Sequence, residues 1–288
     1  MEKEQTDIYA RVTRHIVEAI EAGAGRFRLP WHVTGTPRFR PRNAMSQSAY
    51  RGVNVLALWA TAEARGYESG TWATYGQWCE LGAQVRKGEK STPVALWKVT
   101  ERKRKGEDEE AVLQGGFYAC GYAVFNAAQV DGYRPPEPLV LPEAERVAKA
   151  EAFFADIAAD VRTGGQVACY DRAADCVHIP PFAAFREAAG YYSVLGHELT
   201  HWTGAAHRLN RDLAHRFGSE AYAMEELVAE LGAAFLCSAL GLSNDPRPDH
   251  AAYLASWLRV LKQDRRAVFT AASQAQKAVD WLSDTNAA

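Results

Sequence analysis

The segment His197-Glu198-Leu199-Thr200-His201 holds the residues of this chain that are best suited to chemistry. Histidines four positions apart share one face of a helix, so both imidazoles can bind a single Zn²⁺ ion. Glu198 then lies beside the open coordination position, where a carboxylate can act as a general base towards water. The pattern predicts a hydrolytic metal centre with His197 and His201 as ligands and Glu198 as the catalytic residue.

A catalytic zinc needs three protein ligands, and two residues compete for the third position. His207 completes the spacing HExxHxxGxxH, which is typical of metzincin peptidases. Glu226 is the alternative, and Glu230 lies one helical turn later on the same face, where it could hydrogen-bond a histidine ligand. Both carboxylates would otherwise lie among apolar side chains at a high cost in free energy. The spacing leaves both His207 and Glu226 open.

Five helices and a pair of strands are expected to position these residues. Apolar residues at helical spacing predict helices at 143–159, 187–203, 219–241, 248–261 and 264–283. Residues 167–179 indicate a strand, a turn and a second strand ahead of the HExxH helix. Zincins present an edge strand to an extended substrate, and residues 175–180 are expected to take that position.

The N-terminal half has a different pattern. Its predicted helices cover residues 6–22, 53–65 and 74–81, and its predicted strands cover 94–99 and 116–125 as a hairpin. Four prolines between residues 131 and 142 exclude a helix or a central strand there. We therefore predict an α+β protein with an N-terminal domain at 1–134, a linker at 135–142 and a C-terminal domain at 143–288.

Charge is unevenly divided between these two domains. Residues 1–134 hold 19 Lys and Arg against 15 Asp and Glu, a net charge of +4, whereas the rest of the chain carries −6. Cations interleaved with aromatic rings are typical of proteins that bind single-stranded nucleic acid, because the rings stack on bases. The residues expected to bind DNA are Trp31, Arg42, Tyr50, Arg51, Asn54, Trp72, Lys87 and Lys90. The spacing of Trp72, Tyr75 and Trp78 is equally compatible with core packing.

The composition argues against a membrane protein, a secreted protein and a disulfide-linked fold. The 288 residues are 48% hydrophobic, with no apolar run of the roughly 20 residues that a membrane span needs. The first residues lack the pattern of a signal peptide, so we expect a cytoplasmic protein without a membrane partner. The five cysteines include no CxxC pair, which favours reduced thiols. Cys169 and Cys176 could face each other across the predicted hairpin, but packing is their expected role.

Several longer motifs occur in order along the chain. The first half contains YRGVN at 50–54, WATYGQW at 72–78, GAQVRKGEK at 82–90 and VFNAAQV at 124–130. The second half contains HELTHWTG at 197–204, RLNR at 208–211 and YAMEELVAE at 222–230. The first set resembles the ArdC-type antirestriction proteins and the related N-terminal region of TraC-type plasmid primases. The second set resembles the metallopeptidase-like domain that follows in this family, so the resemblance covers nearly the whole chain.

The resemblance implies a plasmid-encoded protein that binds single-stranded DNA through its N-terminal domain and protects incoming conjugative DNA from host restriction. It also implies a zincin-like C-terminal domain. There His197, His201 and Glu226 would hold Zn²⁺, or another divalent ion such as Mn²⁺, and Glu230 would orient a histidine. The position of His207 is not reliably histidine in the family, which favours Glu226.

Two alternatives to this function stay open. The first is a DNA-binding protection factor whose metal is purely structural. The second is a cytoplasmic metallopeptidase, acting on a host protein or peptide, whose basic domain is incidental.

Overall fold

The computed structural model describes residues 7–24, 40–101, 115–135, 142–213, 219–243 and 250–285. The N-terminal half combines a sheet with three helices, and the C-terminal half is mainly helical with one small sheet. This arrangement confirms the α+β class.

A four-stranded sheet is the framework of the N-terminal half. Its strands follow the order β1 (Arg42–Asn43), β2 (Thr71–Thr74), β5 (Gly115–Asn126) and β4 (Thr92–Glu101). β4 and β5 pair antiparallel, which confirms the predicted hairpin. Strands β3 (Gln84–Val85) and β6 (Val130–Asp131) form a separate pair, and a short helix, η1 (Ala127–Gln129), leads into β6. The helices of this half are α1 (Ile8–Ala24), α2 (Val53–Arg65) and α3 (Tyr75–Glu80).

The C-terminal half contains the five predicted helices. They are α4 (Glu143–Ala155), α5 (Ala188–Thr203), α6 (Glu220–Leu240), α7 (His250–Gln263) and α8 (Ala267–Thr285), with the short helix η2 (Phe182–Ala184) before α5. α4 ends at Ala155 rather than at 159, because the chain turns there into β7 (Asp160–Thr163), a strand that we did not predict.

That additional strand changes the predicted edge of the small sheet. β7 pairs in parallel with β9 (Cys176–Ile179), and β9 pairs antiparallel with β8 (Cys169–Asp171). The strand order is β7-β9-β8, so residues 175–180, which we expected at the edge, contain the central strand. The prediction is therefore corrected: β9 is the central strand of this sheet, and β8 lies at one of its edges.

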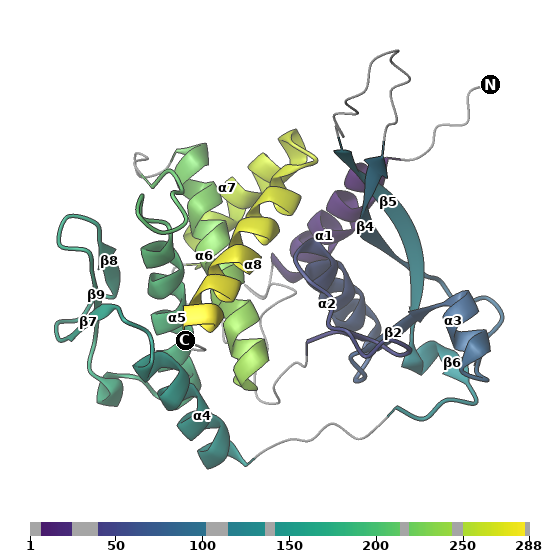
Figure 1. The fold of residues 1–288 in the computed structure, drawn as a ribbon, viewed down its shortest axis with the longest axis horizontal. Coiled ribbons are helices and arrows are strands. Elements are labelled where there is room, and N and C mark those ends of the chain that lie inside the picture. The colour runs from purple at the N-terminus through teal and green to yellow at the C-terminus, as the bar shows by residue number, and fades with distance from the viewer. Residues whose placement is uncertain are drawn as a thin grey trace, which may run out of the picture.

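One hydrophobic core joins the two halves. Val12, Ile16 and Ile20 recur at helical spacing on α1 and belong to the same buried cluster as Leu227 of α6 and Ala272 of α8. α1 and α2 lie between the large sheet and the C-terminal helices, as Figure 1 shows. Each fully buried aliphatic side chain contributes about 1.5–3 kcal/mol to stability. The halves are therefore held together by packing as well as by the chain that connects them.

Within the described ranges, no helix is both long and apolar enough to cross a bilayer. All five cysteines are free thiols. In the β8–β9 register Cys169 lies opposite His178 and Cys176 opposite Asp171, so the two cysteines are diagonal neighbours rather than a facing pair.

Candidate functional site

The two histidines of the HExxH motif on α5 meet the carboxylate of Glu226 from α6. The Nε2 atoms of His197 and His201 are 3.2 Å apart. Glu226 reaches both rings, with Oε2 3.6 Å from His197 Nε2 and Oε1 3.5 Å from His201 Nε2. His197 is 3% exposed and Glu226 is 8% exposed. Three donors thus converge on one point, as a metal with an open fourth position requires.

Glycines let α5 and α6 approach closely enough for this convergence. Gly232 of α6 faces Thr200 so closely that a methyl group on its Cα would overlap the Thr200 side chain. Gly196 of α5 lies against Leu236 in the same interface. The buried Thr200 hydroxyl donates to the Gly196 carbonyl at 2.7 Å, so the close contact leaves that hydroxyl satisfied. The small residues therefore set the helix spacing that brings Glu226 to the histidines.

A carboxylate lies behind each histidine ring. Nδ1 of His201 donates to Glu225 Oε1 at 3.1 Å. Nδ1 of His197 lies 3.9 Å from Oε2 of Glu230, a buried residue one turn after Glu226. Carboxylates in such positions fix the tautomer and orientation of a metal-binding imidazole. Glu230 therefore lies next to a histidine, as we predicted, and Glu225 is an additional residue of the same kind.

Arg211 holds Glu225 in position. Its Nε and Nη2 atoms donate to the two carboxylate oxygens of Glu225 at 3.1 and 2.9 Å. The same guanidinium donates to the hydroxyl of Thr203 and to the carbonyl of Thr200 near the end of α5. Because a bidentate arginine–carboxylate pair has a specific geometry, Arg211 ties the end of α5 to the start of α6.

His207 lies outside this cluster. Its side chain is 64% exposed, and Nε2 is 3.3 Å from Oδ2 of Asp175 in the β8–β9 turn. Arg208, the next residue, donates to Asp175 Oδ2 at 3.1 Å and to the Trp202 carbonyl at 2.6 Å. Of the two candidates for the third ligand position, Glu226 lies with the histidines, whereas His207 lies with Asp175.

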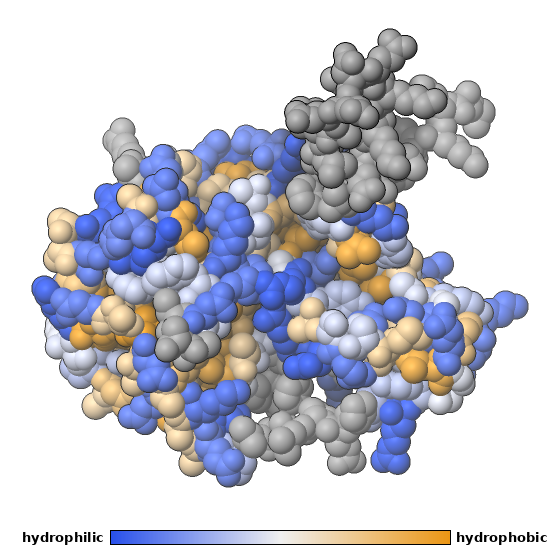
Figure 2. Space-filling model, in the orientation of Figure 1, coloured by the Kyte–Doolittle hydropathy of each residue, from blue (hydrophilic) through white to orange (hydrophobic). Residues whose placement is uncertain are grey.

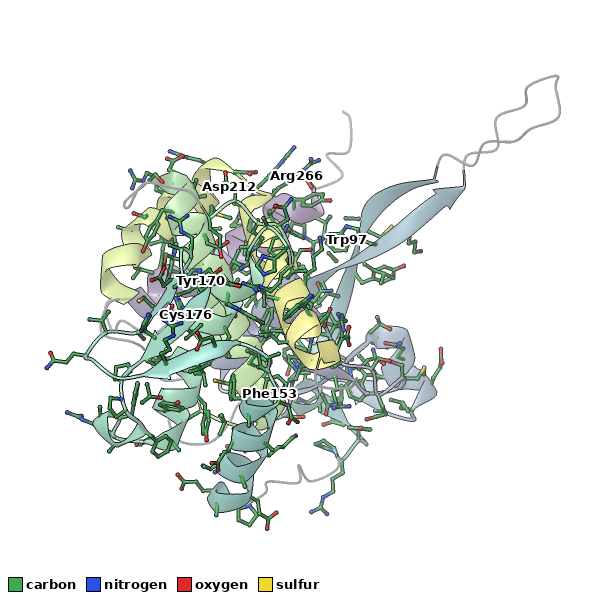
Figure 3. The ribbon with its side chains drawn as sticks, turned by 60° about the vertical axis from the view of Figure 1, so that its left-hand side comes forward. Trp97, Phe153, Tyr170, Cys176, Asp212 and Arg266 are labelled. Atoms are coloured by element: carbon green, nitrogen blue, oxygen red, sulfur yellow. The ribbon has the colours of Figure 1, made fainter. Side chains whose placement is uncertain are left out.

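A cleft of about 590 Å³ opens beside His197, Glu198 and His201. Glu198 is 6% exposed and lines this cleft directly next to the first histidine. The opposite wall is the edge strand β8 with the residues before it, and Figure 3 shows Tyr170 on this small sheet beside the helices. An edge strand has backbone donors and acceptors that can pair with an extended chain.

Charges within the cluster compensate one another. Burial by itself lowers the pKa of His201, but hydrogen bonds to Glu225 and Glu226 raise it to about 10. Burial raises the pKa of Glu226, and hydrogen bonds from His197 and His201 outweigh this effect and lower it well below the usual range. The site therefore stabilises the ionised form of Glu226 next to a positive charge. A metal cation bound at the same place would stabilise it for the same reason.

A second cleft, of about 780 Å³, lies between the large sheet and α8, and we call it the N-terminal cleft. Aromatic and cationic side chains line it, among them Tyr50, Trp97, Tyr122, Arg51 and Lys277. Trp97 is 45% exposed and Tyr122 is 36% exposed. Figure 2 shows apolar and hydrophilic side chains intermixed on the surface between the two halves. Exposed rings can stack on planar groups, and the cations beside them can contact anionic ones.

α8 forms one wall of the N-terminal cleft. The Arg51 guanidinium makes an ion pair with Asp280 of α8. The ring of Trp97 lies 5.9 Å from that of Phe269, also on α8, and Figure 3 labels Trp97 where β4 approaches this helix. The C-terminal half therefore contributes directly to a cleft whose other wall belongs to the N-terminal half.

Three of the predicted DNA-binding residues, Tyr50, Arg51 and Asn54, line the N-terminal cleft. The side-chain amide of Asn54 is already hydrogen-bonded to strand β4. It donates to the Ala95 carbonyl at 2.7 Å and accepts from the Ala95 backbone N–H at 2.8 Å. Burial raises the pKa of Tyr50, so its phenol stays neutral.

The other predicted DNA-binding residues lie elsewhere. Trp72 is 1% exposed and packs against Tyr67, so its ring cannot stack on a base and its assignment is corrected to the core. Arg42, Lys87 and Lys90 are exposed and lie outside the N-terminal cleft. Trp31 lies outside the described residues.

Several residues of both clefts could not be predicted from the sequence. Glu225 directly precedes Glu226, and adjacent side chains on a helix point about 100° apart. Spacing therefore gave no reason to expect both of them beside the same histidines. Trp97 and Tyr122 belong to predicted strands, but alternation cannot say which positions stay exposed. Asp280 lies 229 positions from Arg51, so no local pattern in the sequence could predict that the two residues pair.

Comparisons with known proteins match a separate family model to each half of the chain. A family model described as the N-terminal domain of anti-restriction factor ArdC matches residues 6–125, and one described as a zincin-like metallopeptidase matches residues 148–274. The uncharacterized protein y4eC of Sinorhizobium fredii (strain NBRC 101917 / NGR234) is 54% identical over 281 residues, which cover 96% of this chain and 92% of that protein. DNA primase TraC of Escherichia coli is 36% identical over 95% of this chain, which spans only 27% of that longer protein.

Solved structures extend the similarity to three dimensions. The metal-free crystal structure of the antirestriction ArdC protein from the R388 plasmid is 42% identical, covers 98% of both chains and has a TM-score of 0.80. Its Mn(II)-bound structure has a TM-score of 0.78 over the same coverage. The similarity therefore includes both halves and their relative arrangement.

Proposed function

This chain belongs to the ArdC family of antirestriction proteins with a zincin-like domain, and we propose that it binds single-stranded DNA and protects incoming plasmid DNA from host restriction. The relative from R388 is described as an antirestriction protein, and its fold matches over nearly the full length of both chains. The proposed place of action is the cytoplasm, where entering DNA would meet restriction enzymes.

The residues of the C-terminal site fit a divalent cation. His197, His201 and Glu226 supply two imidazole nitrogens and a carboxylate within 4.8 Å of one another. Two histidines and a glutamate are a donor set of catalytic zinc sites, so we propose Zn²⁺ held by these residues. Mn²⁺ is the alternative, because one solved structure of the R388 relative is Mn(II)-bound. Glu225 would orient His201, and Glu230 would orient His197.

The hydrolytic role follows from Glu198 and the cleft. When bound, the metal supplies Lewis-acid chemistry that polarises a carbonyl and makes water more acidic. Glu198 would accept a proton from water and pass it to the leaving group. The edge strand β8 would hold an extended peptide by backbone hydrogen bonds. The single observation that carries this proposal is the convergence of the three ligands next to Glu198 in a cleft with an edge strand.

The DNA-binding role rests on the N-terminal cleft. Its exposed rings, Trp97 and Tyr122, would stack on bases, and Arg51 and Lys277 would contact phosphates. We propose this cleft, rather than the buried Trp72, as the stacking surface. Because α8 is one of its walls, DNA binding would involve both halves of the chain.

Replacement of Glu198 by Gln tests whether the function needs hydrolysis. Conjugative transfer would be measured into restricting and non-restricting recipients, with single-strand binding by the purified variant measured in parallel. Loss of protection with normal DNA binding is the expected result. Full protection by Glu198→Gln would refute the hydrolytic role and leave a protection factor with a structural metal. Glu220→Gln, an exposed glutamate in the first turn of α6, is the matched control.

A further inference from the structure

The small sheet β7-β9-β8 presents a second group of metal-ligating side chains. Cys176 and His178 are two positions apart on β9 and therefore project from the same face of the sheet. In the antiparallel register Asp171 lies opposite Cys176 and Cys169 lies opposite His178, so all four share that face. The other face carries Val177 with Tyr170 opposite it, and both pack on the hydrophobic core.

Three of these side chains converge. One carboxylate oxygen of Asp171, the sulfur of Cys176 and a ring nitrogen of His178 all lie within 4.8 Å of one another. The Cys176 Sγ to His178 Nε2 distance is 3.4 Å. Cys176 is fully buried, and the other two are half-buried. The cluster is thus partly shielded from water but open on one side, through which an ion could enter.

Other roles for this cluster explain less of the geometry. A thiol nucleophile must reach a substrate, and the sulfur of Cys176 lies in a residue with no exposed surface. A disulfide would need Cys169 and Cys176 to face each other, whereas they are diagonal neighbours in the register. The Asp171 Oδ1 atom accepts hydrogen bonds from the amides of Ala173 and Ala174, which leaves Oδ2 for another partner.

A cation on β7 lies next to the cluster and interacts electrostatically with Asp171 and Cys176. Arg162 of β7 lies beside His178 in the parallel register. Its guanidinium donates to Asp160 at 2.6 and 2.9 Å, and more than half of its side chain is exposed. The position among the three donor atoms is therefore not occupied by this side chain.

We propose that Asp171, Cys176 and His178 bind a second divalent cation of the Zn²⁺ type, separate from the group of His197, His201 and Glu226. A thiolate with an imidazole selects zinc-like ions over Mg²⁺ or Ca²⁺, which prefer all-oxygen sites. Water would complete the coordination. The ion would hold β8 and β9 together and so stiffen the edge strand that lines the cleft beside His197, Glu198 and His201.

Titration of the full chain with Co²⁺ tests this site, because only a thiolate ligand produces a sulfur-to-cobalt charge-transfer band. The histidine–glutamate site has no thiolate, so the band reports the second site alone. We expect the band and two bound equivalents in the unmodified protein. His197→Ala/His201→Ala should lose one equivalent and keep the band, so failure of the first site would not be mistaken for failure of the second.

Cys176→Ser should abolish the band and leave one equivalent. If that buried substitution prevents folding, His178→Ala, at a half-buried position, takes its place and should weaken Co²⁺ binding and shift the band. Cys79→Ser, an exposed thiol elsewhere, should leave the band unchanged. Absence of the band in the unmodified protein, or its persistence in folded Cys176→Ser, would overturn the proposal.

Discussion

Nδ1 of His201 donates to Oε1 of Glu225 at 3.1 Å, and Arg211 binds the same carboxylate from the other side. This relationship links three elements: the end of α5, the segment after it and the start of α6. It gives the RLNR motif a physical role, because its second arginine fixes the carboxylate that orients a histidine of the metal-binding motif.

Replacement of Glu225 by Gln should weaken binding of Zn²⁺ or Mn²⁺. The amide lacks the negative charge that supports the His201 ring, and loss of such a partner costs about 10- to 100-fold in metal affinity. Isothermal titration of the metal-free protein would measure the effect, with Glu220→Gln as the control on the same helix. Equal affinities for Glu225→Gln and the unmodified chain would contradict this role.

Replacement of Gly232 by Ala should destabilise the C-terminal half. The added methyl group would overlap Thr200 and push α6 from α5, at a cost of about 1–3 kcal/mol. Gly190→Ala is the matched control, because a methyl group there meets Phe185 only at 3.9 Å and should stabilise α5 by up to about 1 kcal/mol. Thermal unfolding of both variants should therefore give shifts of opposite sign.

The network of Asp175 should make stability depend on pH. The Arg208 hydrogen bond lowers the pKa of Asp175 from 3.8 to about 2. A carboxyl whose pKa is lowered by folding contributes stability above its unfolded pKa, and this contribution is lost as the pH falls from 3.8 through about 2. Because 40% of this side chain is exposed, solvent screening limits the contribution to about 1 kcal/mol.

Asp175→Asn tests that contribution. At neutral pH the variant should unfold at a lower temperature than the unmodified chain, and the difference should shrink as the pH is lowered towards 2. Asp156→Asn, an exposed residue at the end of α4, provides the control for a general change in charge. A difference that stays constant with pH would exclude the proposed linkage.

Replacement of Arg51 by Ala and of Asp280 by Asn should change single-strand affinity in opposite directions. Arg51→Ala removes a phosphate contact, so affinity should fall and the logarithmic salt slope should decrease by about 0.7. Asp280→Asn frees Arg51 from its ion pair, so affinity should rise. Fluorescence anisotropy at several salt concentrations would measure both. Arg259→Ala, an exposed arginine on α7, should change neither the affinity nor the slope.

Replacement of Trp97 by Ala should weaken binding of a short single-stranded oligonucleotide. Loss of one stacked base costs about 1–3 kcal/mol, or about 5- to 150-fold in affinity. Trp97→Phe keeps an aromatic surface and should retain most of the binding. Tyr75→Ala removes a ring that is 50% exposed outside the N-terminal cleft and should have no effect. Similar losses for Tyr75→Ala and Trp97→Ala would argue against a specific stacking position.

Local patterns in the sequence determined most of the helices and the core of the metal site. The helical spacing of His197 and His201 and the chemistry of Glu198 depend only on residues within one turn. The relation between Glu226 and Glu230 is equally local, and both glutamates lie beside the histidines. Ile16 and Ile20 likewise marked the buried face of α1 before any tertiary contact was known.

Only the tertiary structure decided which distant residues meet. The choice of Glu226 over His207 as neighbour of the histidines depends on the close approach of α5 and α6 at Gly232. β7 is a strand because β9 is available to pair with it, although its own residues gave no strand signal. The burial of Trp72 and the exposure of Trp97 depend on what packs against each face of the sheet. Spacing describes neighbours along the chain, whereas these contacts join segments far apart in sequence, so only the folded chain could reveal them.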